Sequence, residues 1–390
     1  MNTNTSTGIN SETKNMKTEC LKDVLKNALS QAEKMTGKNL SLPVLSGVYV
    51  SANKKTNTLS LRATNLDLGI EISFPAKVEE EGDIVVPPAA LVGLLSGIYD
   101  KKASLFVEGG NLAISSINTS SLVKGIPNDG FPTLPVIQEG EGGSGESFEI
   151  PVSVFLDGVK SVWYSASTSD MKPEISSVCL YRKDDDAVFA ATDSFRLSEK
   201  KIPLKNQGGK NFHLLVPHKN IIEIMRVFEG LDGAMKISFN KNQVSFSAPE
   251  KGIYITSRII DGIFPDYEQI IPKNHSTEAT LLKQDLVNAL KIANIFSDKF
   301  NRVDIAVSAT KKLFELRSNN AAVGENTARL DAQITGDDIS LGFNHKYILD
   351  CFQSIKQESV TLHFAGAGKP MVLRGAGDKS FLSLIMPLSV

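Results

Sequence analysis

The pattern of hydrophobic and polar positions repeats three times along the chain, at a spacing of roughly 130 residues. Each copy opens with apolar residues three and four positions apart, which predicts an amphipathic helix. The predicted opening helices span Leu21–Met35, Val152–Ser165 and Asp285–Phe296. Two of them also share letters, in Asp23-Val24-Leu25-Lys26-Asn27-Ala28-Leu29 and Asp285-Leu286-Val287-Asn288-Ala289-Leu290. A repeat of this kind indicates one supersecondary unit used three times.

Strand-like runs and a second helix follow each opening helix. The first runs are Val44–Val50, Ile175–Tyr181 and Val303–Val307. The next run carries Ala63-Thr64-Asn65 in copy one and Ala191-Thr192-Asp193 in copy two, in the same phase. A second helix is predicted to begin at Val86-Pro87, Val216-Pro217 and Phe343-Asn344. Proline suits the first turn because that turn's amide has no helical partner. The first two copies close alike, with Asp129-Gly130-Phe131-Pro132 and Asp261-Gly262-Ile263-Phe264-Pro265.

Size and charge restrict the classes of protein to consider. The chain has 390 residues, 42 Lys and Arg against 44 Asp and Glu, and a net charge of −2. Three copies therefore have ordinary domain size, and any polyanion site must be a local patch. Cys20, Cys179 and Cys351 are odd in number and far apart, so we expect buried or inert thiols in a reducing compartment. Neither a membrane-spanning run nor a signal peptide is evident, and we expect a cytoplasmic protein without membrane contact.

The composition predicts a division into five segments. They are a disordered tail (1–17), domain 1 (18–138), a Gly/Glu linker (139–147), domain 2 (148–272) and domain 3 (273–390). Gly140, Gly142 and Gly145 match the letters of a dinucleotide-binding turn. That turn requires a helix to follow, whereas strand-like Phe148-Glu149-Ile150 follows here, and nearby glutamates would repel a phosphate. We therefore interpret the glycines as a linker.

Enzyme signatures are missing from the sequence. The five histidines are scattered and none pairs with a nearby cysteine, so we expect no zinc site, no metal and no cofactor. Asp184-Asp185-Asp186 separates two strand-like runs, which favours a hairpin turn over an ion site. Asp193 has no second acid or histidine at a suggestive spacing. These observations predict a non-catalytic scaffold with no catalytic residue.

Four stretches together resemble the bacterial DNA polymerase III beta subunit family, the replicative sliding clamps. They are Leu42-Pro43-Val44-Leu45-Ser46, Ala191-Thr192-Asp193-Ser194-Phe195-Arg196-Leu197, Asp261-Gly262-Ile263-Phe264-Pro265-Asp266-Tyr267 with Ile271-Pro272, and Met386-Pro387-Leu388. The resemblance runs in order from residue 18 to residue 390. It implies an α+β fold of three repeated DNA-clamp domains per chain, with helices lining the inside and β-sheets outside. It also implies a head-to-tail dimer that closes into a ring.

The resemblance implies a processivity factor that encircles duplex DNA without sequence specificity. Its implied partners are double-stranded DNA, a second copy of itself, the replicative DNA polymerase, the clamp loader, and repair polymerases, ligase and mismatch-repair proteins, in the nucleoid-associated cytoplasm. The polymerase, the clamp loader and the repair proteins would each dock a short peptide in a groove between domains 2 and 3 of this chain. The implied groove residues are Ile175, Thr192, Ser194, Phe195, Arg196, Leu197, Pro265, Gln269, Ile270, Asn344, Tyr347, Leu384, Ile385, Met386, Pro387 and Leu388.

The chain departs from the family pattern inside this groove. Ser194-Phe195 stands where many members carry glycine and then histidine or tyrosine, and Gln269 stands where a basic residue is frequent. These differences bear on peptide preference. By resemblance, the dimer interface joins a late strand of domain 1, around Ala113–Val123, to the first helix and neighbouring strand of domain 3.

Cations in the helical segments are candidates for contact with DNA phosphates. They are Lys22, Lys26, Lys160, Lys219, Arg226, Lys291 and Lys346. Each is also compatible with an ordinary solvated side chain. A three-domain enzyme with an unrecognised motif is the alternative hypothesis, and it requires convergent titratable groups in one cleft. A clamp with a specialised role, present as a second copy in its genome, is a third.

Overall fold

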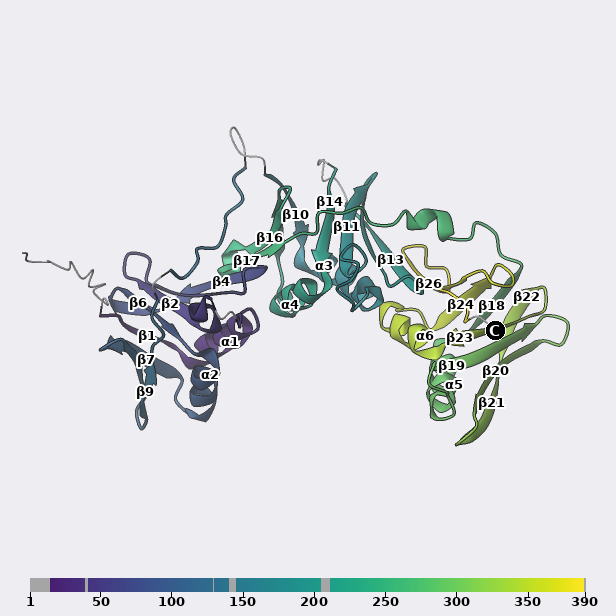
Figure 1. Ribbon diagram of the computed structural model, residues 1–390, viewed down its shortest axis with the longest axis horizontal. Helices are drawn as coiled ribbons and strands as arrows, with labels where there is room; N and C mark the ends of the chain where they lie inside the picture. Colours follow the sequence, from purple (N-terminus) through teal and green to yellow (C-terminus); the bar gives the residue numbers. More distant parts are fainter. Residues whose placement is uncertain (1–14, 39–40, 129, 140–144, 205–210, 389–390) are drawn as a thin grey trace, which may run out of the picture. The chain divides into compact units, whose positions relative to one another are not determined.

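The computed structural model describes residues 15–38, 41–128, 130–139, 145–204 and 211–388. The chain forms two compact units (Figure 1). Unit 1 contains Met1–Glu149 and Gly233–Arg258, and unit 2 contains Ile150–Asp232 and Ile259–Val390. Part of the second copy therefore folds with the first copy, whereas its remainder folds with the third.

The α-helices of the described chain form three pairs, one in each copy. The paired helices are α1 (Lys22–Glu33) with α2 (Pro88–Gly97), α3 (Val152–Val162) with α4 (His218–Phe228), and α5 (Lys283–Ile295) with α6 (His345–Cys351). Short 3₁₀ turns are η1 (Pro43–Ser46), η2 (Trp163–Ser165), η3 (Pro249–Lys251), η4 (Tyr267–Ile270) and η5 (Phe352–Ser354). Both predicted helices of each copy are thus confirmed. Among the described residues, no helix is both long and apolar enough to cross a membrane.

Unit 1 contains two antiparallel sheets. The five-stranded sheet has the order β5 (Lys77–Glu80), β1 (Lys17–Leu21), β7 (Lys102–Glu108), β8 (Asn111–Ser115) and β9 (Ser120–Lys124). The eight-stranded sheet has the order β10 (Glu146–Pro151), β15 (Ala234–Phe239), β16 (Gln243–Ala248), β17 (Ile253–Arg258), β4 (Leu68–Pro75), β3 (Thr58–Thr64), β2 (Val48–Asn53) and β6 (Gly82–Val86). Pairing of β17 with β4 joins a strand of copy two to copy one.

Unit 2 also contains two antiparallel sheets. The nine-stranded sheet has the order β14 (His213–Pro217), β11 (Ser177–Lys183), β12 (Asp186–Thr192), β13 (Arg196–Pro203), β26 (Phe381–Ile385), β25 (Met371–Gly375), β24 (Ser359–Phe364), β18 (Thr277–Leu282) and β22 (Ala332–Gly336). The four-stranded sheet has the order β21 (Gly324–Leu330), β20 (Leu313–Asn320), β19 (Arg302–Ser308) and β23 (Ile339–Asn344). Pairing of β13 with β26 joins copy two to copy three.

The repeated Ala-Thr-Asn/Asp letters form the same hairpin corner in both copies. The Thr64 hydroxyl donates to the Leu68 carbonyl at 3.0 Å and accepts from the Leu66 amide at 3.0 Å. The Asn65 side chain accepts from the Leu68 amide at 2.8 Å, and Leu66 has φ +77°. Ser194 in copy two has the same φ of +77°. This left-handed corner ends one strand and begins the strand that pairs with the neighbouring copy.

Several local predictions are confirmed by the structure. The turn at Asp184 is confirmed, because β11 and β12 flank it and its φ is +52°. The strand at Phe148 is confirmed as part of β10, and all three cysteines are free and buried. Burial raises the pKa of Cys20 to about 12, in agreement with an inert thiol.

Two local predictions were wrong in their limits. The run from Val44 begins as 3₁₀ turn η1, because Pro43 sits in its first turn and β2 starts only at Val48. The predicted disordered tail extends too far, since Met16 is fully buried and Lys17 begins β1. Residues 1–14 lie outside the described residues. The central linker glycines, from Gly140 to position 144, lie outside them as well.

Candidate functional site

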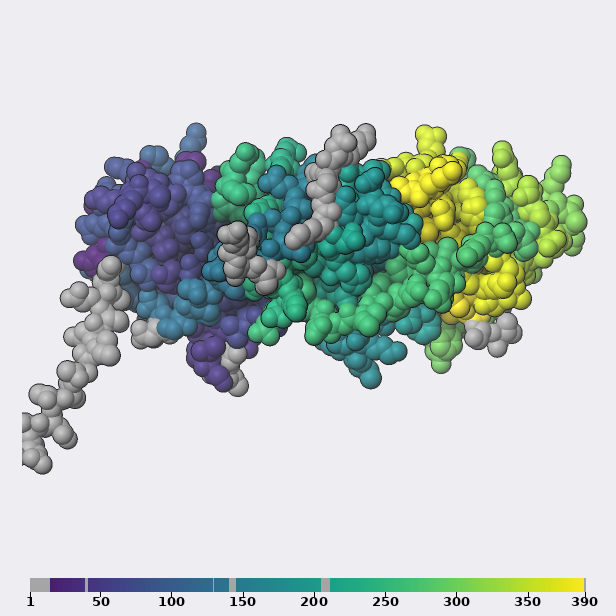
Figure 2. Space-filling view, turned by 90° about the horizontal axis from the view of Figure 1, so that it is seen from above, coloured from purple at the N-terminus to yellow at the C-terminus, as the bar shows by residue number. Residues whose placement is uncertain are grey.

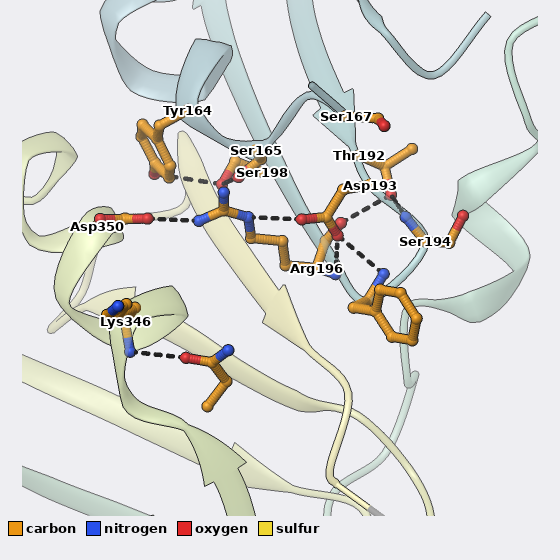
Figure 3. A network of polar contacts seen from close by, with 12 residues as sticks. Tyr164, Ser165, Ser167, Thr192, Asp193, Ser194, Arg196, Ser198, Lys346 and Asp350 are labelled. Carbon is orange, nitrogen blue, oxygen red and sulfur yellow. Dashed lines mark hydrogen bonds and ion pairs between the residues drawn. The ribbon is translucent and has the colours of Figure 1, made fainter. Parts of the chain in front are cut away.

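The corner between β12 and β13 is held together by its own side chains (Figure 3). The Thr192 hydroxyl donates to the Arg196 carbonyl at 2.7 Å and accepts from the Ser194 amide at 3.2 Å. The Asp193 carboxylate accepts from the Phe195 and Arg196 amides, both at 2.9 Å. Because the backbone is fixed in this way, Phe195 projects to solvent whereas Arg196 turns inward.

Arg196 connects this corner to the third copy. Its guanidinium donates from Nε to Asp193 at 3.0 Å and from Nη1 to Asp350 of α6 at 2.6 Å (Figure 3). The same group lies over the Tyr347 ring, 4.5 Å from its centroid. Burial, reinforced by the Asp193 carboxylate, raises the pKa of Tyr347, so its hydroxyl stays neutral. The corner of copy two is thus attached to a helix of copy three.

A neutral hydroxyl network lies behind Arg196. The Ser198 hydroxyl donates to Tyr164 at 3.2 Å, and the Ser165 and Ser198 hydroxyls are 2.8 Å apart. The Tyr164 and Ser354 hydroxyls are 3.1 Å apart, and Tyr164 packs within the apolar core of the third copy. Burial raises the pKa of Tyr164. The network therefore supports Arg196 without supplying a proton donor or acceptor that titrates near neutrality.

The C-terminal residues lie between the two copies of unit 2. Strand β26 pairs with β13, and beyond it the Met386 amide donates to the Phe195 carbonyl at 2.8 Å. The Leu388 amide donates to the Gly342 carbonyl of β23 at 2.8 Å. Met386 and Leu388 are therefore held on one side by the corner and on the other by the strand that leads into α6.

The connecting segment between β17 and β18 covers one face of the nine-stranded sheet. Phe264 and Tyr267 are buried there in a cluster with Leu197 and Leu384, and Met386 packs against the same cluster. The space-filling view shows this segment, in green, running across the surface of unit 2 (Figure 2). The cluster thus brings together the connecting segment, β13 and the C-terminal strand.

A buried polar chain anchors the connecting segment beneath this surface. The Tyr267 hydroxyl donates to Glu199 at 2.7 Å and lies 2.7 Å from the Tyr181 hydroxyl. Burial raises the pKa of Tyr181 to about 12, and burial together with Glu199 raises the pKa of Tyr267. Lys183 donates to Glu268 of the segment at 2.5 Å. The segment is therefore a fixed part of the site.

The predicted groove residues separate into three groups by exposure. Those that are buried are Ile175, Thr192, Leu197, Leu384 and Ile385. Those that are half-buried are Arg196, Asn344, Tyr347, Met386, Pro387 and Leu388. Those that are exposed are Ser194, Phe195, Pro265, Gln269 and Ile270. The last two groups include six residues with apolar or aromatic side chains, named the docking surface after the prediction that a peptide binds there: Phe195, Ile270, Tyr347, Met386, Pro387 and Leu388.

Some predicted groove residues have other principal contacts. Ile175 lies before β11, two strands from β13, and its carbonyl accepts from the Ser167 amide at 2.9 Å. The Asn344 side chain caps α6 by accepting from the Lys346 amide at 3.0 Å. The Gln269 amide group donates to Asp266 at 2.6 Å. Asn344 and Gln269 therefore stabilise the local backbone beside the docking surface.

The candidate DNA-facing cations all lie on the paired helices, and several are already engaged. Lys160 pairs with Glu229 at 2.6 Å, and Lys219 pairs with Asp170 at 2.7 Å. Arg226 pairs with Glu223, whereas Lys22 binds the Ile98 carbonyl and Asp23. Lys26 is half-buried, and Lys291 and Lys346 are exposed. Surface ion pairs of this kind contribute little to stability, typically about 0–1 kcal/mol.

Sequence reasoning missed three contributors to the site. Asp350 lies 154 positions from Arg196, and Tyr164 lies 190 positions from Ser354. Gly342 contributes only a backbone carbonyl. None of these contacts has a local signal, because each depends on which strands pair across the two copies.

Three copies of a helix pair against a sheet, joined copy to copy by strand pairing, define a three-domain α+β clamp fold. The chain matches three domains of one family. The N-terminal domain of the DNA polymerase III beta subunit matches residues 16–135, the central domain matches 149–266, and the C-terminal domain matches 268–389. The chain therefore belongs to the DNA polymerase III beta subunit family.

Relatives of known sequence and structure agree over nearly the whole chain. The beta sliding clamp of Staphylococcus epidermidis is 26% identical over 377 residues, covering 94% of this chain and 97% of the relative. That of Synechocystis is 25% identical over 394 residues, covering 96% and 99%. A crystal structure of the sliding clamp from Bacillus subtilis has a TM-score of 0.88 at 23% identity, covering 96% and 99%. One from Pseudomonas aeruginosa bound to griselimycin has a TM-score of 0.87 at 22% identity, covering 96% and 100%.

Proposed function

We propose that this chain is a DNA sliding clamp, a non-catalytic processivity factor that encircles duplex DNA as a head-to-tail homodimer. It acts on nucleoid DNA in the cytoplasm and tethers a replicative polymerase to its template. The proposal rests on the strand pairing that joins one repeated copy to the next. Within the chain, copy two joins each neighbouring copy through a strand pair, β4 with β17 and β13 with β26.

Two sheet edges that have no further strand among the described residues support a third joint of the same kind, between chains. The five-stranded sheet ends at β9 and the four-stranded sheet ends at β21. Joining these edges gives nine strands, the size of the large sheet already present in unit 2. The joint is heterologous, and a heterologous interface closes into a ring when its rotation permits. Open edges of this length are otherwise a liability for aggregation.

The opposite edges of the same two sheets are protected. Strand β5 has only four residues and carries exposed glutamates, which is typical of a protected edge. Strand β23 accepts a hydrogen bond at Gly342 from the C-terminal Leu388. Apolar side chains instead gather at the proposed joint, with Leu122 of β9 60% exposed and Ile292 and Ile295 of α5 exposed. Burying them supplies the hydrophobic contribution to dimerisation.

Encirclement explains why a nearly neutral chain can be retained on DNA. A closed ring needs only weak phosphate contact, because topology rather than affinity prevents its escape. The cations on the paired helices supply such contact without reading sequence. Sliding then requires that each phosphate contact exchange rapidly, as paired surface lysines do.

The docking surface supports tethering of partner proteins through a short peptide. Phe195 and Ile270 are exposed apolar anchors, and Met386 is an adaptable thioether that packs against the buried cluster below. The Arg196 guanidinium, which is held by Asp193 and Asp350, and the half-buried Tyr347 place polar groups beside these anchors. We propose that a short peptide docks here, in which a glutamine is followed by apolar and aromatic residues. The polymerase, the clamp loader, repair polymerases, ligase and mismatch-repair proteins would each carry such a peptide.

A peptide-binding measurement tests the docking surface. A fluorescein-labelled peptide of that composition is titrated with the full chain, and anisotropy reports binding. Phe195→Ala and Met386→Ala are each expected to weaken binding by about tenfold, as for truncation of an apolar anchor. Phe300→Ala is the matched control, because Phe300 is 59% exposed and Phe195 is 62% exposed. Equal losses in Phe195→Ala and the control would contradict the assignment.

A dimerisation and extension measurement tests the ring. Leu122→Arg places a charge at the proposed joint, and sedimentation is expected to show monomers where the unaltered chain forms dimers. Primer extension with a loader, ATP and polymerase should then lose its long products. Met171→Arg is the control, because Met171 is a highly exposed apolar residue of unit 2 that belongs to neither edge strand. Unchanged dimers in Leu122→Arg would exclude this joint.

A further inference from the structure

Two histidines and a glutamate converge at the end of the connecting segment, away from the docking surface. Glu278 of β18 stands directly opposite His363 of β24 in the strand register, so both side chains project from one face of the sheet. His275 lies three residues before Glu278, just ahead of β18. This cluster was not predicted from the sequence, because His275 and His363 are brought together only by the pairing of β18 with β24.

The distances within the cluster match a metal site. His275 Nε2 lies 3.1 Å from Glu278 Oε2, and His363 Nδ1 lies 3.5 Å from the same oxygen. One ligand atom from each residue lies within 4.8 Å of the others. A tetrahedral zinc ion with bonds of roughly 2.0–2.1 Å separates neighbouring ligand atoms by about 3.3 Å. The two separations from Glu278 Oε2 are close to this value, and the 4.8 Å limit on the third means that the histidine nitrogens need to move together by no more than about 1.5 Å to receive an ion.

A second observation is that His363 Nδ1 is buried without a hydrogen-bond partner among the described residues. A buried polar nitrogen left in this condition costs free energy, which a bound cation would remove. The three residues also line an open hollow of about 400 Å³. Water from this hollow can fill the fourth coordination position, as in zinc sites with three protein ligands.

We propose that His275, Glu278 and His363 bind a divalent first-row transition metal ion of the zinc type. Two imidazole nitrogens and one carboxylate suit zinc, whereas magnesium and calcium prefer oxygen alone. The ion fastens the end of the connecting segment to the sheet of domain 3. Phe264 and Tyr267 already hold the earlier part of the segment on the same sheet, so the metal completes its attachment.

Charged neighbours shape this site further. Lys273, Arg374 and Lys379 line the hollow together with Asp378. The positive charges of these three side chains outnumber the one further carboxylate, so they repel a metal dication that has no anionic ligand. They therefore favour an anion or a polarised water in the open fourth coordination position. The site is thus expected to bind zinc together with a solvent-derived ligand.

Zinc titration of the full chain tests the proposal. After treatment with a chelator, the chain is titrated with zinc by calorimetry in a competing metal buffer, and cobalt is used as a spectroscopic probe. One zinc per chain is expected, together with the intense visible absorption of four-coordinate cobalt. Millimolar magnesium should not displace either ion. Absence of stoichiometric binding would overturn the proposal.

Matched variants locate the site. His363→Gln and Glu278→Gln are each expected to weaken zinc binding by at least roughly tenfold. Loss of a residue that only hydrogen-bonds to a metal ligand already lowers metal affinity by about 10–100-fold, and loss of a ligand should cost no less. His218→Gln is the control, because it also removes one histidine from unit 2. His218 lies on α4, where its ring stacks on Trp163, and it is not part of the proposed metal site. Folding of each variant is checked by its thermal transition. Unchanged zinc binding in the two site variants would contradict the assignment, and the histidine–glutamate contacts would then be ordinary ion pairs.

A cleavage measurement tests the role of the ion. Lys273 is exposed and lies two residues before His275, so trypsin can cut the chain after it. Zinc is expected to slow cleavage at Lys273 in the unaltered chain and not in His275→Gln, with fragments identified by mass. Equal cleavage of the unaltered chain with and without zinc would refute fastening of the segment.

Discussion

The contact between Arg196 and Asp350 offers the sharpest test of how the site is assembled. Arg196 is 12% exposed and Asp350 is 43% exposed. A hydrogen bond to a charged group contributes about 1.5–3 kcal/mol, and the exposure of Asp350 places its bond at the lower end because solvent screens it. The Tyr347 stack adds about 0.5–1 kcal/mol. Arg196→Met should therefore lower the free energy of unfolding by about 2–2.5 kcal/mol, and Asp350→Asn by about 1–2 kcal/mol.

The assay is a double-mutant cycle in urea, followed by the fluorescence of the single tryptophan. Trp163 is well placed because it stacks on His218 within unit 2 and is adjacent to Tyr164. The double variant should lose about 1–2 kcal/mol less than the sum of the single variants, since the shared bond is removed only once. Lys219→Ala is the control, because its exposed pair with Asp170 should contribute less than about 0.5 kcal/mol. Additive losses within about 0.5 kcal/mol would refute the coupling.

Three further predictions concern stability and use thermal or urea unfolding. Ser194→Gly and Leu66→Gly should each stabilise the chain by up to about 1 kcal/mol, because both positions have φ +77°; destabilisation would contradict this. Glu315, which is buried, has its pKa lowered by Arg329 and then by Arg317. The ionised carboxylate therefore stabilises the fold near neutral pH, and this contribution is lost as the pH falls. The Tm of Glu315→Gln should lie below that of the unaltered chain near neutral pH and approach it in acid. A difference in Tm that stays the same at every pH would contradict this prediction. In Gly158→Ala the new methyl group would lie 2.3–2.5 Å from ring atoms of Phe189. This crowding should cost about 1–3 kcal/mol, which exceeds the gain of about 1 kcal/mol in helix propensity. A variant more stable than the unaltered chain would refute the crowding.

The sequence was sufficient to predict the repeated elements because their signals are local. The Thr192 corner, the turn at Asp184 and the helices after Pro87 and Pro217 each depend on residues within a few positions. The 3₁₀ turn at Pro43 was missed, because an apolar run alone does not distinguish a short turn from a strand.

Contacts between copies were beyond local reasoning. Asp350 reaches Arg196, and His363 reaches His275, only because long-range strand pairing brings them together. The grouping of Gly233–Arg258 with unit 1 has the same origin, since β17 pairs with β4. The docking surface could be anticipated only through the family resemblance, and its residues remain a prediction.

Retention on circular DNA distinguishes a closed ring from a protein that binds DNA only by charge. The purified chain is loaded onto nicked circular duplex DNA with its clamp loader and ATP, washed at moderately high salt, and then released by linearising the circle. Protein is expected to survive the wash and to leave only when the DNA gains ends, because a closed ring is held by topology. Salt-sensitive loss from circles and linear DNA alike would indicate ordinary electrostatic binding and would contradict encirclement.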